Sequence, residues 1–191
     1  AGESAEVAAW TAAGRLRASI GTGCGEHWSE PQDVDPENVR DPWLPSVSIT
    51  KERAFAVFAD RRAGNYDIYV AQSELGAASW GASARVDPRP PENRWRPAVA
   101  ATNGPLGGRT VVAWSDFRRY VWDAMAYAHG DDDVRLIDSA PAEALEWFQT
   151  DLSLAAAPDG SIWAAWGDVR WRRPDSDIRA ARWTPEEGWL E

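Results

Sequence analysis

A stretch of aromatic and charged residues recurs three times along the chain, and this repetition limits the possible folds more than any other feature. The copies are "FADRRAGNYD" (58–67), "WSDFRRYVWD" (114–123) and "WGDVRWRRPDSD" (166–177). In each copy an aromatic residue is followed two positions later by an Asp, then by an Arg, and a second Asp closes the stretch. These residues are Asp60, Arg62 and Asp67; Asp116, Arg118 and Asp123; Asp168, Arg170 and Asp177. Self-similarity at a fixed period is typical of a repeat architecture.

Other residues keep the same period. Trp43, Trp95 and Trp147 follow one another at steps of 52 residues, and Trp28 and Trp80 are separated by the same step. Residues 1–191 are therefore interpreted as a single repeat domain or a fragment of one. Its units span approximately 5–40 (partial), 41–92, 93–144 and 145–191 (partial).

Within one unit, alternating apolar and polar residues predict four short strands. They lie at "PSVSIT" (45–50), "RAFAVFAD" (53–60), "DIYVAQS" (67–73) and "WGASARVD" (80–87). Four antiparallel strands at a period of about 40–55 residues indicate an all-β protein, a β-propeller built of four-stranded blades. A two-sheet sandwich is the alternative fold, but a sandwich needs no strict repeat. In a propeller, Trp114, Trp163 and Trp166 are expected to fill the space between blades.

The pattern W-x-D-x-R … D-I-Y-x-A-x-S … W resembles the repeat of sialidase-like propellers, the BNR or Asp-box group. The Asp box itself is retained only as "SELGAASW" (73–80), in which Leu75 replaces the Asp. The resemblance implies a propeller of six or more blades and an extracellular or periplasmic, secreted protein. It also implies an alternative function, in which this chain supplies part of a sialidase-type glycoside hydrolase. "RWRP" (94–97) is similar to the Arg-x-Pro element of such enzymes.

The repeated Asp and Arg residues are interpreted as structural. Arg62 is expected to bridge Asp60 and Asp67, and Arg118 and Arg170 are expected to do the same in the next two units. A catalytic group is needed once, whereas a clip between strands is needed in every blade. We therefore predict no catalytic residue in this chain.

Composition excludes several classes of function. The net charge is −10, with 20 basic and 30 acidic residues, so the chain lacks the basic face that nucleic acid requires. It contains no apolar run of about 18 residues, so no membrane insertion is predicted. Cys24 is the single cysteine and forms neither an intrachain disulfide nor a cysteine metal site. The three acids beside His129, Asp131–Asp133, are consecutive and cannot all converge on one ion, so neither a metal nor another cofactor is predicted.

One series of residues is a candidate for ligand binding. Trp43, Trp95 and Trp147 each precede the first strand of a unit, where aromatic rings can stack on sugars. Arg94 and Arg96 are their polar neighbours. In the competing interpretation, each Trp closes the seam between two blades. The predicted function is a non-catalytic module for binding or assembly, with a glycan or a protein as ligand.

The ends of the chain fall inside units. The first unit begins with a second strand at 6–14, and the last unit ends where a fourth strand begins, at 188–191. A propeller must close, because open sheet edges expose unpaired backbone groups. The sequence therefore predicts a piece of a larger propeller, whose missing blades come from the rest of a larger protein or from a second copy.

Overall fold

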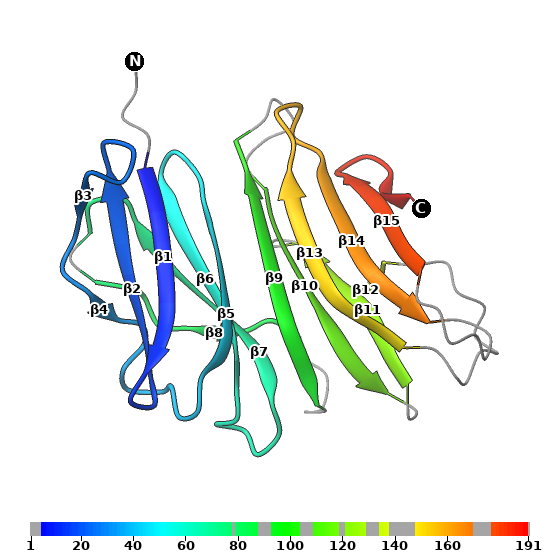
Figure 1. The fold of residues 1–191 in the computed structure, drawn as a ribbon, viewed down its shortest axis with the longest axis horizontal. Helices are drawn as coiled ribbons and strands as arrows, with labels where there is room; N and C mark the ends of the chain where they lie inside the picture. Colours follow the sequence, from blue (N-terminus) through cyan, green and yellow to red (C-terminus); the bar gives the residue numbers. More distant parts are fainter. Residues whose placement is uncertain are drawn as a thin grey trace.

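Strands in the structure form a fan of sheets, shown in Figure 1 from β3 and β4 at one side to β15 at the other. Neighbouring strands are antiparallel except for β11 and β13, which pair in parallel at one position. The computed structural model describes residues 5–77, 79–87, 93–103, 109–118, 121–128, 134–137, 148–169 and 177–190. Every regular element within these ranges is a strand, which confirms the predicted all-β class. In this part of the chain there is no helix with the length and apolarity needed to cross a membrane.

Four groups of strands follow one another, and we call them blades 1 to 4. Blade 1 contains β1 (Ala5–Ala12), β2 (Arg15–Thr22), β3 (His27–Trp28) and β4 (Gln32–Asp33). Blade 2 contains β5 (Trp43–Ile49), β6 (Arg53–Asp60), β7 (Asp67–Glu74) and β8 (Ala84–Arg85). Blade 3 contains β9 (Arg94–Thr102), β10 (Arg109–Arg118), β11 (Val121–Ala128) and β12 (Arg135–Leu136). Blade 4 contains β13 (Phe148–Ala156), β14 (Ile162–Val169), β15 (Asp177–Thr184) and β16 (Gly188–Leu190).

The blades pack face to face, because the second strands of blades 2, 3 and 4 carry apolar residues on both sides. Along β6, Phe55 and Val57 face blade 3, while Ala56 and Phe58 face blade 1, as the alternation predicts. The first strands lie side by side, with β5 beside β9 and β9 beside β13. Three apolar clusters result, one at each junction between successive blades. This stacking of one unit on the next buries a continuous core.

The first strands of blades 2, 3 and 4 share a β-bulge, in which two residues oppose one residue of the neighbouring strand. Leu44, Arg96 and Asp151 open these bulges and have φ angles of 48°, 52° and 57°. A positive φ is uncommon for residues other than glycine. Its recurrence at one place in three blades marks this bulge as part of the repeat.

Candidate functional site

The paired acids of the repeat face each other across neighbouring strands. The backbone pairs are Asp60 with Asp67, Asp116 with Asp123, and Asp168 with Asp177. The first acid of each pair is buried, and the aromatic residue two positions earlier explains part of the motif. The Nε1–H of Trp114 donates to Asp116 at 3.2 Å, and Trp166 donates to Asp168 at 3.4 Å. A Trp in this position therefore satisfies a buried carboxylate in its own strand.

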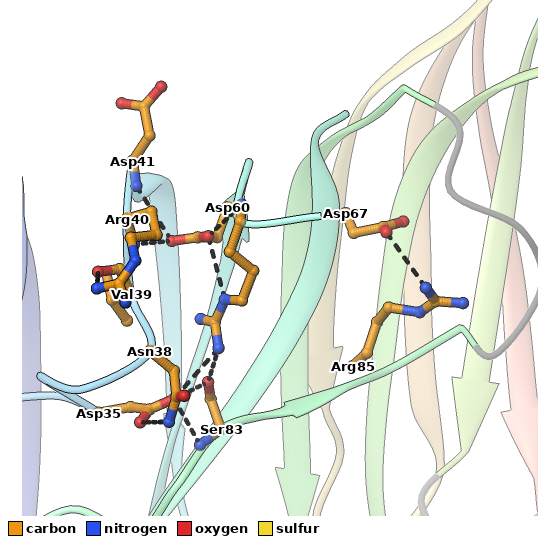
Figure 2. A network of polar contacts seen from close by, with 10 residues as sticks. Asp35, Asn38, Val39, Arg40, Asp41, Asp60, Asp67, Ser83 and Arg85 are labelled. Atoms are coloured by element: carbon orange, nitrogen blue, oxygen red, sulfur yellow. Dashed lines mark hydrogen bonds and ion pairs between the residues drawn. The ribbon is translucent and has the colours of Figure 1, made fainter. Parts of the chain in front are cut away.

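Asp60 and Arg62 join blades 1 and 2. Figure 2 shows the network that contains Asp60, Asp35 and Ser83. The Asp60 carboxylate accepts hydrogen bonds from the backbone N–H groups of Arg40, Asp41 and Arg62 at 2.9, 3.3 and 2.8 Å. The Arg62 side chain donates to Asp60 through Nε at 3.1 Å and to Asp35 of blade 1 through Nη1 at 3.3 Å. The predicted contact between Asp60 and Arg62 is therefore present.

The predicted contact between Arg62 and Asp67 is wrong. The Arg62 guanidinium lies 3.9 Å from the centre of the Tyr69 ring, and this stacking aims it toward Asp35 and Ser83. The Asp67 carboxylate forms ion pairs instead with Arg85 and Arg94, at the junction of blades 2 and 3. The clip therefore ties one blade to its predecessor rather than two strands of one blade. The side chain of Arg118 and the whole of Arg170 lie outside the described residues.

Arg94 holds the equivalent junction between blades 2 and 3. Its guanidinium is 1% exposed and forms ion pairs with Asp67, with Asp87 at 3.2 Å and with Asp116 at 3.1 Å. All three carboxylates are fully buried. Burial raises the pKa of Asp67, against the opposing effect of the Arg94 charge. Arg94 was predicted to contact a ligand, but the structure places it inside the domain.

Gln149 occupies the corresponding position at the junction of blades 3 and 4. It pairs with Asp168 in the strand register, as Arg94 pairs with Asp116. Its side chain donates to Asp168 at 3.3 Å and accepts from the backbone N–H of Ala124 at 2.7 Å. A neutral amide thus replaces the guanidinium in the third junction. These two junctions share the position of the polar bridge but not its charge.

Asp35 gives this network a pH dependence. Burial would raise its pKa, but hydrogen bonds from Ser83 and Asn38 and the charge of Arg62 lower it below the ordinary 3.8. The stabilisation from Asp35 is therefore present above pH 3.8 and is lost as the pH falls through its folded-state pKa. Asp35→Asn is expected to reduce the free energy of unfolding at pH 7 by about 1–3 kcal/mol.

Urea unfolding at pH 7 and pH 3 measures this effect. The difference between Asp35→Asn and the parent protein should shrink at pH 3, because this pH lies below the ordinary pKa of 3.8 and approaches the lowered folded-state pKa. Asp151→Asn removes an exposed acid (65% exposed side chain) and serves as the control with little effect. A deficit for Asp35→Asn that is equal at both pH values would contradict the assignment.

Aromatic side chains gather where the first strands of blades 2 and 3 begin. The ring centroids of Trp43 and Trp95 are 4.9 Å apart, and Tyr66 lies 5.9 and 5.4 Å from them. Trp122 continues the series at 6.1 Å from Trp95, and Phe117 lies 5.1 Å from Trp122. We call these five residues the aromatic row. Trp43 is 41% exposed at one end of it.

Two ion pairs flank the aromatic row. Arg61 pairs with Asp41 at 3.3 Å and lies 5.6 Å from the centre of the Tyr66 ring. Arg96 pairs with Asp151 of the next blade, and both of these side chains are more than half exposed. Both of these arginines are therefore matched by a carboxylate. The row is an apolar surface with a charge-balanced margin.

The predicted tryptophan series is only partly equivalent in structure. Trp43 and Trp95 pair with Ala59 and Ser115, each of which directly precedes the first acid of its repeat. In blade 4 the residue at this register is Thr150, which pairs with Gly167. The step from Trp95 to Trp147 therefore misplaced the third position. Trp147 itself lies outside the described residues.

Sequence reasoning missed Tyr66, Phe117 and Trp122 as members of the row. A signal was present, since Tyr66 and Trp122 each directly precede the closing acid of the repeated stretch. The hydroxyl of Tyr66 donates to Asp41 at 3.1 Å. Burial and the neighbouring Asp41 carboxylate raise the pKa of Tyr66, which disfavours its phenolate.

The described residues contain no group of three or more His, Cys, Asp or Glu side chains that could hold a metal ion. His129 and Asp131–Asp133 lie outside this part of the chain. A cavity of about 470 Å³ lies at the opposite end of β5, around the turn that joins it to β6. Its lining includes Lys51, Arg53 and Asn103.

Comparison with solved structures identifies the class of fold. A protein of unknown function from Dyadobacter fermentans superposes with a TM-score of 0.62 at 14% identity, over 94% of this chain and 52% of that one. A thermostable family-43 glycoside hydrolase gives 0.59 at 14% identity, over 100% and 69%. The NanB sialidase from Streptococcus pneumoniae gives 0.54 at 12% identity, over 85% and 25%. The chain spans about half the length of the Dyadobacter protein.

No family model matches the sequence, and no curated protein does. The structural neighbours include β-propeller glycoside hydrolases, and the antiparallel blades of this chain share their architecture. The predicted β-propeller fold is therefore confirmed. At these identities the likeness shows the fold alone.

Proposed function

We propose that this chain is a carbohydrate-binding propeller module and that the aromatic row is its binding surface. The observation that carries the proposal is the placement of Trp43 and Trp95 at equivalent bulges of neighbouring blades. Tyr66 and Trp122 extend the same surface on either side of Trp95. Aromatic rings present large, rigid apolar faces with polar edges, and such faces suit the C–H surface of a sugar ring.

The proposed ligand is a neutral oligosaccharide. Arg61 and Arg96 each form an ion pair with a carboxylate, so neither provides an unpaired positive charge for binding an acidic sugar. A run of rings across two blades suits several sugar units rather than one. The resemblance to sialidase-like propellers supports an extracellular or periplasmic location, which is part of this proposal.

The burial of the repeated aspartates favours a non-catalytic role. Asp60, Asp67 and Asp116 are fully buried in ion pairs and cannot reach a substrate. Glycoside hydrolysis needs two accessible carboxyl groups, or a Tyr nucleophile assisted by an acid. Tyr66 and Asp41 form a Tyr–acid pair, and this pair is the one observation that favours the hydrolase alternative. The raised pKa of Tyr66 opposes its action as a nucleophile.

A glycan array probed with the intact protein tests the proposal. We expect binding to neutral oligosaccharides and little binding to sialylated ones, with hits confirmed by intrinsic tryptophan fluorescence. A fluorogenic sialoside measures the alternative activity, which should equal the buffer control. The absence of any glycan bound at millimolar concentration would overturn the proposal, and hydrolysis of the sialoside would replace it by the hydrolase alternative.

A further inference from the structure

The turn that joins β5 to β6 is fixed by its own hydrogen bonds and carries two basic side chains. The Thr50 hydroxyl accepts from the backbone N–H groups of Glu52 and Arg53 at 3.3 and 3.0 Å. The backbone N–H of Thr50 donates to the Arg53 carbonyl at 2.8 Å. Lys51, the only lysine of the chain, and Arg53 both line the cavity of about 470 Å³ at this turn. The turn therefore presents two cations to one cavity.

Neither of these cations forms an ion pair with a carboxylate of the described residues. The Arg53 guanidinium donates to the amide oxygen of Gln72 at 3.4 Å, and both Lys51 and Arg53 are exposed. Among the described residues that line the cavity, Glu52 is the single acid. The cavity therefore has more positive than negative charge, in a chain whose net charge is −10.

Asn103 of blade 3 adds a neutral donor whose orientation is fixed. Its Oδ1 accepts a hydrogen bond from the backbone N–H of Lys51 at 3.0 Å. Because the amide oxygen is bound to that N–H, the other end of the amide is the NH₂ group, which can only donate. Within the described part of the chain, this NH₂ group has no acceptor. It is therefore available, beside Lys51, to an anionic acceptor.

An adjoining cavity of about 90 Å³ gives the site an apolar side. Phe55, Gln72 and Thr110 line both cavities, and Val70 and Val112 line the smaller one. We call the two cavities together the junction pocket. Its walls are strands of blades 2 and 3, which face each other within the described chain. A pocket that is cationic on one side and apolar on the other suits a ligand with the same division.

We propose that the junction pocket binds a small organic carboxylate that has an apolar portion. Lys51 and Arg53 donate charge-assisted hydrogen bonds to the carboxylate. Asn103 donates to it through Nδ2, and Phe55 contacts the apolar portion. The pocket lies at the opposite end of β5 from Trp43, so this site is separate from the aromatic row and does not depend on the function proposed for it.

The next junction provides a natural comparison. Arg109 begins β10 as Arg53 begins β6, and it lines a cavity of about 270 Å³. Arg135 is a second cation there, but Glu186 and Glu187 line the same cavity. Its described charges therefore balance, and the excess of positive charge is a property of the junction pocket. Arg109 is the matched control position for Arg53.

Isothermal titration of the protein with phenylacetate tests the proposal. Phenylacetamide is the neutral probe, and acetate is the probe without an apolar portion. We expect saturable binding of phenylacetate and roughly tenfold weaker binding of the other two. Lys51→Met and Arg53→Met should each weaken phenylacetate binding about tenfold, because each removes one charge-assisted donor. Arg109→Met should leave the affinity unchanged.

Asn103→Asp separates loss of the ligand contact from loss of folding. The new side chain keeps an oxygen that accepts from the Lys51 N–H, but it replaces the donor by a second carboxylate oxygen that repels an acid. Phenylacetate binding should be lost while circular dichroism and thermal unfolding remain those of the parent protein. Phenylacetate that does not bind at millimolar concentration, or phenylacetamide that binds equally well, would overturn the proposal. Full affinity in Asn103→Asp, or equal weakening by Arg109→Met and Arg53→Met, would also overturn it.

Discussion

Arg94→Met is expected to lower the free energy of unfolding by about 3–5 kcal/mol, which is the cost of breaking a buried ion pair by removing one partner. The Arg94 guanidinium is the buried cation that Asp67, Asp87 and Asp116 share. Its loss leaves three buried carboxylates without that partner. Arg85 lies 3.7 Å from Asp67 and is 28% exposed, so it cannot replace a fully buried charge.

Urea unfolding of Arg94→Met measures this loss, with Arg96→Met as the control. Arg96 is on the same strand, two residues away, but its ion pair with Asp151 is exposed. Exposed pairs contribute about 0–1 kcal/mol, so the control should remain close to the parent protein. Equal losses in the two variants would show that the buried network does not support the junction of blades 2 and 3.

The deficit of Arg94→Met should also depend on pH. Burial already raises the pKa of Asp67 in the parent protein, and removing the guanidinium raises it further. A carboxyl whose folded-state pKa is raised destabilises the protein least below its ordinary pKa of 3.8, where it is protonated in both states. The loss of stability grows as the pH rises from 3.8 through the folded-state pKa. The deficit should therefore be larger at pH 7 than at pH 4. A deficit that grows on acidification would contradict this account.

Trp43→Ala is expected to weaken glycan binding by about 2 kcal/mol, or roughly 30-fold, the scale of an aromatic hot spot. Trp43 is the exposed end of the aromatic row and contacts both Trp95 and Tyr66. Isothermal titration with the strongest neutral oligosaccharide from the array gives the affinity. Circular dichroism and thermal unfolding establish that the variant is folded.

Trp28→Ala is the matched control for Trp43→Ala. Trp28 is 48% exposed on β3 of blade 1 and takes no part in the aromatic row. Its replacement should leave the affinity unchanged. If the two substitutions weaken binding equally, or if Trp43→Ala has no effect, the ligand surface lies elsewhere on the protein.

The strands were predictable because their signal is local. The alternation in 53–60 places successive side chains on opposite faces, and β6 has the same bounds in the structure. The partners of the charged residues were not predictable in this way. Whether Arg62 reaches Asp67 or Asp35 depends on how neighbouring blades pack, and no pattern within one unit specifies that packing.

The candidate site shows the same division. Spacing placed Trp43 and Trp95 at equivalent positions. The bulges that follow them are separated by the same number of residues as the repeated strands of blades 2 and 3. Spacing failed for Trp147, since the bulge of blade 4 opens at Asp151, 55 residues after Arg96. Arg94 and Arg96 both looked like neighbours of a ligand in the sequence. Only the three-dimensional structure separates the buried one from the exposed one.

The bulge at the start of the first strands has a consequence for how such a protein diversifies. It separates the residue before it from the regular ladder that follows, because two residues on one strand are accommodated opposite one on the next. That residue is Trp43 in blade 2, Trp95 in blade 3 and Thr150 in blade 4, while a regular antiparallel ladder continues beyond the bulge in all three. If the proposed binding surface is correct, blades 2, 3 and 4 each offer a position at which recognition can change while the strands beyond the bulge keep their pairing.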